Sequence, residues 1–123
     1  MLTALRRGAD PNAADRDGTT PLYRASVQNR PVAVRLLLQA GADPNVESGH
    51  GEEGTPLTGA AAWGHLDVVR ELLAYGADPS RREDHGSGRS PLDWAVRGGH
   101  PETAALLVAA GAEIPVPVGR RDG

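Results

Sequence analysis

Apolar residues along the chain recur at helical spacing, in blocks that return further along. The pattern Val-x-x-Leu-Leu begins at Val34 and again at Val69, and its last two residues return as Leu106 and Leu107. Positions three and four residues apart share one face of an α-helix. The pattern predicts helices over residues 31–39, 66–74 and 101–109, each preceded by a shorter helix over residues 21–28, 56–63 or 91–98.

Short motifs at the ends of these blocks are repeated with one period. Successive copies of each motif lie 33 or 35 residues apart. The motifs are Gly-Ala-Asp-Pro, beginning at Gly8, Gly41 and Gly76 (with Gly-Ala-Glu at Gly111), Thr/Ser-Pro-Leu, beginning at Thr20, Thr55 and Ser90, and Gly-His, beginning at Gly64 and Gly99. Thr or Ser before Pro is typical of a helix N-cap followed by the first helical position, where Pro needs no partner for a missing N–H. Gly after the longer block is typical of a left-handed helix C-terminus.

In this order, Thr-Pro-Leu, Gly-His, a Leu-rich helix and Gly-Ala-Asp resemble the ankyrin repeat family, from about Leu2 to Glu113. The resemblance implies an all-α fold, an ankyrin-type α-solenoid of stacked helix-turn-helix repeats with β-hairpin or loop fingers. We expect an ankyrin repeat domain over residues 1–113 (a half repeat at 1–12 and repeats at about 13–45, 46–80 and 81–113) and a C-terminal tail at 114–123.

The residue after Thr-Pro-Leu departs from the family, which usually has His there. This chain has Tyr23, Thr58 and Asp93. A carboxylate near a helix N-terminus is favourable by about 0.3–1 kcal/mol, so Asp93 suits its position. Thr58 offers less, and we expect the middle cap to be the weaker one.

The fingers differ in length, since residues 45–55 and 80–90 each contain two positions more than residues 12–20. Surface loops accept insertions at little cost, which is one interpretation. The other is that long fingers contact a partner, because binding residues concentrate on loops held by a rigid scaffold. The finger residues expected to bind a partner are Arg16, Asp17, Thr19, Glu52, Glu53, His85 and Arg89.

The two Trp residues are assigned different roles by the resemblance. Trp94 takes an apolar position that faces between helices in the family, so it is expected in the core. Trp63 precedes Gly64, where family members vary and side chains reach the concave groove; the alternative is that it packs on an adjacent repeat. Trp and Arg are frequent at binding hot spots. The groove positions expected to bind a partner are Val27, Gln28, Ala62, Trp63 and Arg97.

No motif in the sequence indicates catalysis, and we expect neither a cofactor nor a metal. His65 and His100 belong to the Gly-His turns, where a structural role is expected. His50 and His85 occupy equivalent finger positions near acidic residues. Neighbouring elements about 8–10 Å apart would not easily share one ion with ligand distances near 2 Å. A metal-binding or enzymatic protein using these fingers is the second alternative.

Composition narrows the possible partners. The net charge of −3 predicts no general attraction to nucleic acid. There is no Cys, no signal-peptide core and no apolar run long enough to cross a bilayer, so the chain is expected to be cytoplasmic and without a membrane partner. All 13 basic residues are Arg, which indicates GC-rich coding and a bacterial source.

Both ends of the repeat array look incomplete. Residues 1–7 match only the second helix of a repeat, and residues 103–110 are apolar nearly all round. Terminal repeats usually need a polar outer face. We expect the segment 114–118, Ile-Pro-Val-Pro-Val, to cover the last helix and keep the chain monomeric; otherwise that helix would be a surface for self-association or for a partner.

These observations predict a non-enzymatic protein–protein interaction module that binds another protein through its concave groove and finger loops, as an adaptor, an inhibitor or an immunity-type neutraliser. The alternative is a structural fragment of a longer ankyrin solenoid.

Overall fold

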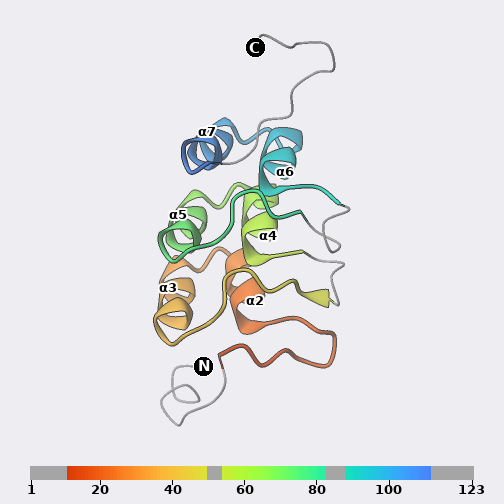
Figure 1. Ribbon diagram of the computed structural model, residues 1–123, viewed down its shortest axis with the longest axis vertical. Coiled ribbons are helices and arrows are strands. Elements are labelled where there is room, and N and C mark those ends of the chain that lie inside the picture. Colours follow the sequence, from red (N-terminus) through yellow and green to blue (C-terminus); the bar gives the residue numbers. More distant parts are fainter. Residues whose placement is uncertain (1–10, 50–53, 83–87, 112–123) are drawn as a thin grey trace.

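A computed structural model describes residues 11–49, 54–82 and 88–111 of the chain. Within these ranges six helices form three consecutive pairs (Figure 1). The pairs are α2 (Pro21–Val27) with α3 (Pro31–Gln39), α4 (Pro56–Trp63) with α5 (Leu66–Ala74), and α6 (Pro91–Arg97) with α7 (Pro101–Ala109). The helices expected from the sequence are confirmed, with only α2 and α6 ending one residue earlier than expected.

Each short helix begins at the cap that the sequence predicts. The hydroxyl groups of Thr20, Thr55 and Ser90 accept hydrogen bonds from backbone N–H groups three residues later. At Ser90 the cap is reciprocal, because the Asp93 carboxylate also accepts from the Ser90 N–H at 3.1 Å. Thr58 instead places its hydroxyl 3.0 Å from that of Thr55. Asp93 therefore satisfies one more backbone donor than Thr58 does.

The turn between the helices of a pair has the same conformation in all three repeats. Its central residue has positive φ: +57° at Asn29, +70° at Gly64 and +75° at Gly99. The next N–H donates back to a carbonyl five residues earlier, as His65 does to Ala60 at 3.0 Å. Asn is among the few residues other than Gly that adopt a positive φ readily, which explains why the first repeat can have Asn29 where the other two have Gly.

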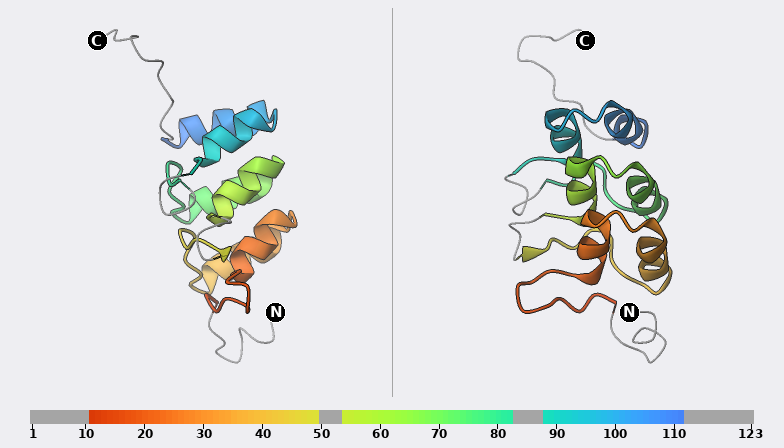
Figure 2. Two further views of the ribbon diagram at one scale, coloured as in Figure 1. Left: turned by 90° about the vertical axis from the view of Figure 1, so that its right-hand side faces the viewer. Right: turned by 180° about the vertical axis from the view of Figure 1, so that it is seen from behind.

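The helices stack in two columns, with α2, α4 and α6 in one and α3, α5 and α7 in the other (Figure 1), and Figure 2 shows the same two columns from behind. Each helix contributes a buried Leu at an equivalent position to the core between the columns, and α3 adds a second one, Leu38: the equivalent residues are Leu22, Leu37, Leu57, Leu72, Leu92 and Leu107. Small buried residues recur beside them at Ala25, Ala60 and Ala95. Because Ala occupies little space, it allows neighbouring helices in the first column to approach closely.

Polar side chains link each repeat to the next. Asn12 Oδ1 accepts from the Asp43 N–H at 2.7 Å, and Asn45 Oδ1 accepts from the Asp78 N–H at the same distance. The equivalent residue in the third repeat is Ser80. The first two fingers are also joined, because the Gly49 N–H donates to the Gly18 carbonyl at 3.0 Å.

The fingers are loops for the most part. Within the described ranges their β-structure is a single antiparallel bridge between Ser48 and Gly54, and their described parts project to one side of the stack (Figure 1). Four predictions fall wholly or largely outside the described residues: the half repeat at 1–12, of which only residues 11 and 12 are described, the finger residues Glu52, Glu53 and His85 (with His50), the covering segment 114–118, and the tail at 114–123.

The outer face of the last helix pair is apolar and open within the described part of the chain. Val96 is 64% exposed, whereas Ser26 and Ala61, which occupy the same position in the first two repeats, are fully buried. A hollow of about 630 Å³ lies on this face between α6 and α7, lined by the apolar residues Leu92, Val96, Ala104, Ala105 and Val108 and by the charged residues Arg89, Asp93 and Arg97. We call this the end face.

Candidate protein-binding surface

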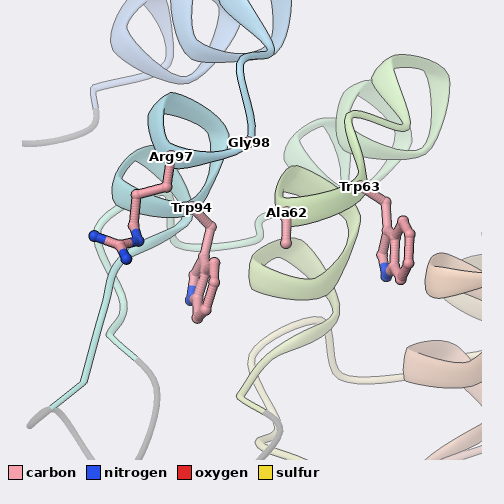
Figure 3. Close-up of a pocket in the computed structure, with 5 residues that line it drawn as sticks. All are labelled: Ala62, Trp63, Trp94, Arg97 and Gly98. Carbon is pink, nitrogen blue, oxygen red and sulfur yellow. The ribbon is translucent and has the colours of Figure 1, made fainter.

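The first column of helices carries a hollow of about 580 Å³ between α4 and α6. Its lining residues are Ala62, Trp63, Trp94, Arg97 and Gly98 (Figure 3). We call it the tryptophan hollow. Three of the predicted groove residues, Ala62, Trp63 and Arg97, come together here because they hold neighbouring positions of the repeat pattern in adjacent repeats.

Trp63 is the last residue of α4, and its side chain is 66% exposed. The indole ring stacks on the imidazole ring of His65, with centroids 6.5 Å apart and an interplanar angle of 10°. His65 is itself fixed, because its Nε2 lies 3.1 Å from the Val27 carbonyl of the preceding repeat. A carbonyl oxygen can only accept, so Nε2 carries the hydrogen. Trp63 is thus an exposed indole held in place by a neighbour that is anchored to another repeat.

His100 makes the equivalent bond one repeat later, from Nε2 to the Ala62 carbonyl at 3.1 Å. Its ring lies close to both Gly64 and Gly98, where an added Cβ would come within 2.5 and 2.8 Å of it. The structural role predicted for His65 and His100 is confirmed. Both bind the turn of one repeat to the end of the first helix in the repeat before.

Trp94 was expected in the core, and this prediction is wrong. The side chain is only partly buried and lines the tryptophan hollow. Successive residues of an α-helix are about 100° apart around its axis, so Trp94 lies about 200° from Leu92, the residue that points into the core. The Arg89 guanidinium lies 5.3 Å from the centroid of the indole, in position for a cation–π interaction.

Arg97 brings a positive charge to the hollow. It belongs to none of the ion pairs formed within residues 11–49, 54–82 and 88–111. The nearby acid Asp93 is engaged elsewhere, with the Ser90 N–H and with Arg82 at 3.5 Å. Helix α4, on the other side of the hollow, has no charged residue at all.

The predicted residues of the first finger lie apart from the hollow, on the loop before α2. Arg16 and Asp17 are exposed, while Thr19 is half-buried and uses its backbone to close a turn with Asp15. The sequence had not indicated Asp15 or its ion pair with Arg24. The Thr19 N–H, which donates to the Asp15 carboxylate, lowers the pKa of Asp15 from its ordinary value of 3.8, and the Asp17 N–H and the Arg24 guanidinium act in the same direction.

The remaining groove residues lie one repeat from the hollow. Val27 is half-buried, and a Cβ added to Gly59 would come within 2.7 Å of its side chain. Gln28 is exposed at the end of α2. Arg89 contacts the hollow indirectly, through Trp94.

Within the described residues, no three or more His, Asp or Glu side chains are gathered as a metal site would require. Every buried side-chain nitrogen or oxygen atom in these ranges has a hydrogen-bond partner. No helix in the same ranges has the length and apolar character needed to cross a membrane.

Stacked helix pairs, each tied only to its neighbours, define a helical repeat protein of the solenoid class. A family model described as ankyrin repeats (3 copies) matches residues 45–117, and one described as ankyrin repeat matches residues 17–48. The chain therefore belongs to the ankyrin repeat family, whose repeats are generally protein–protein interaction modules.

A relative from Caenorhabditis elegans, described as an ankyrin repeat and LEM domain-containing protein 1 homolog, is 52% identical over 42 residues. The match covers 34% of this chain and 6% of the relative.

Proposed function

We propose that this chain binds a partner protein through the surface formed by its first column of helices and its finger loops, and that it does so without catalysis. The observation that carries the proposal is Trp63, an indole that is 66% exposed yet held by a fixed stacking partner. A large exposed aromatic side chain in a hollow is typical of a binding hot spot.

The rigidity of the surface supports the proposal. Bonds from His65 and His100 fix the ends of α2 and α4, and the Gly49–Gly18 bond fixes the first two fingers against each other. A partner would meet side chains that are already ordered, so less conformational entropy would be lost on binding. The role could be that of an adaptor, an inhibitor or an immunity-type neutraliser, in a cytoplasmic and bacterial setting.

The test is capture of partners from the native host by the wild-type chain and by a double variant, Trp63→Ala with Arg97→Ala. The matched control is Val32→Ala with Arg70→Ala, which removes one exposed apolar side chain (57% exposed) and one exposed Arg from the second column of helices. We expect the first pair of substitutions to abolish capture and the control pair to leave it unchanged. Partners that survive the first pair and are lost with the control pair would place binding on the other column.

The end face supports a second candidate, in which the chain is one portion of a longer ankyrin solenoid. Val96 would then be covered by a following repeat, as Ala61 is covered here. An antibody against this chain, used on an extract of the native host, distinguishes the two. A band near 12.8 kDa would support the free-standing binder, and a much larger band would support the longer solenoid.

A further inference from the structure

The two indoles of the tryptophan hollow leave a space between them. Trp63 and Trp94 project in the same direction on either side of Ala62, whose side chain is a single methyl group (Figure 3). The hollow has a volume of about 580 Å³. Such a space, with two indoles for walls and a small residue at its base, is suited to a bulky apolar side chain of a partner.

Each of the two indoles contacts a second side chain that restricts its position. Trp63 stacks on His65, and Trp94 has the Arg89 guanidinium 5.3 Å from its ring centroid. The side chains that would receive a partner residue are therefore already restricted before binding, which reduces the entropy that binding would cost.

The charge next to this space is positive, although the whole chain carries −3. Arg97 lies at one end of the row of side chains, beside Trp94, and both indole nitrogens are on the side of their rings that faces Arg97 (Figure 3). Guanidinium and indole N–H groups are donors only. A carboxylate is therefore suited to Arg97, and an ammonium group would be repelled by the like charge of Arg97.

We propose that the tryptophan hollow is the anchor site for an acidic peptide segment of the partner, in which a bulky apolar side chain sits between Trp63 and Trp94 and a nearby carboxylate pairs with Arg97. This proposal rests on the proposed function and specifies the partner's chemistry at one site. Arginine suits this role because its fork of N–H donors matches a carboxylate in two parallel hydrogen bonds.

A library of random nonapeptides, displayed with both ends linked so that only side chains supply carboxylates, tests the proposal. The library is first depleted on the Trp63→Ala chain and then selected on the wild-type chain. We expect enriched peptides to carry Leu, Ile, Phe or Trp within two positions of Asp or Glu. Enrichment of basic peptides, of apolar peptides without an acid, or of none at all would overturn the anchor site.

The role of Arg97 is then measured with one enriched peptide and its amide analogue, in which Asp becomes Asn or Glu becomes Gln. Trp63 and Trp94 are the only Trp residues in the chain, so fluorescence excited at a wavelength that the two Tyr residues do not absorb reports on the hollow alone when the chosen peptide contains no Trp. We expect the amide analogue to bind about tenfold more weakly, which corresponds to about 1.4 kcal/mol. Arg97→Gln should weaken the acidic peptide by the same factor and leave the amide analogue unaffected.

Arg70→Gln, at an exposed Arg on the second column, is the matched control and should change neither affinity. Equal binding of the acidic peptide to the wild-type and Arg97→Gln chains would overturn the pairing with a carboxylate. Failure here is distinct from failure of the proposed function. If partner capture depends on Trp63 but the library shows no preference for acidic peptides, the proposed function stands and only the proposal of an acidic anchor segment is refuted.

Discussion

Gly64 and Gly99 occupy the same position in consecutive repeats, yet replacing each by Ala should have different consequences. Both have positive φ, +70° and +75°, which costs an L-residue about 1–2 kcal/mol. At Gly99 nothing lies within 4 Å of an added Cβ, so we expect Gly99→Ala to cost only this amount. At Gly64 the added Cβ would lie 2.5 Å from His100 Nδ1 and 2.7 Å from its Cγ, so the ring would have to move.

Movement of the His100 ring would weaken its hydrogen bond to the Ala62 carbonyl, which joins the second and third repeats. A net hydrogen bond contributes about 0.5–1.5 kcal/mol. We therefore expect Gly64→Ala to cost about 1 kcal/mol more than Gly99→Ala in the free energy of unfolding, or about 4 °C more in melting temperature. Urea denaturation followed by circular dichroism, together with thermal melting, measures both differences.

A double-mutant cycle isolates the cause. In a His100→Ala background the ring is absent, so Gly64→Ala should cost no more than Gly99→Ala does in the wild type. Equal costs for the two single variants, or an extra cost of Gly64→Ala that persists without the His100 ring, would refute the reasoning.

Three further predictions concern a cap, a carboxylate and the tail. Ser90→Ala should lower the free energy of unfolding by about 1 kcal/mol, while Ser90→Thr keeps the cap; equal urea midpoints for the two variants would contradict this. The Asp15 carboxylate should titrate by NMR with a midpoint below 3.8, because its pKa is lowered in the folded chain. The ionised carboxylate then stabilises the folded chain fully above the pKa that Asp15 has in the unfolded chain, and this stabilisation is lost as the pH falls through its pKa in the folded chain. Asp15→Asn should therefore destabilise the chain at neutral pH and not at strongly acidic pH. A titration midpoint at or above 3.8 would exclude this. Removal of residues 112–123 should lower solubility and melting temperature if the segment 114–118 covers the end face, and a shortened chain that keeps both would rule the cover out.

The helices and caps were predictable because they depend on short-range patterns. Thr or Ser before Pro, and Gly after a Leu-rich block, specify where helices begin and end without reference to the rest of the chain. The repeat period then aligned Ala62, Trp63 and Arg97, because equivalent positions of adjacent repeats lie side by side in a stack. Periodicity thus located most of the tryptophan hollow.

The core position expected for Trp94 came from the resemblance, since this position is apolar and faces between helices in the family, and the helical period of this chain does not support it. The rotation of about 200° from Leu92 indicates an outward position, and the helical period alone contained that information. The pair between Asp15 and Arg24 was not predictable in the same way. This pair depends on a tight turn in which Gly18 has a φ of +80°. The spacing of residues in the sequence does not specify the course of the backbone through such a turn, and so it does not show that Asp15 and Arg24 meet.

The bonds of His65 and His100 each span 38 residues, from a turn to the carbonyl at the same position of the preceding repeat. Because this offset is constant, the insertion of a further 35-residue unit in phase would leave every such bond with a partner of the same kind. Duplication of one unit in the gene would therefore lengthen the chain without requiring a new kind of interface between repeats. Each added unit would extend the binding surface and bring two fresh positions equivalent to Ala62 and Trp63, so that new specificity could arise while the older contacts stay in place.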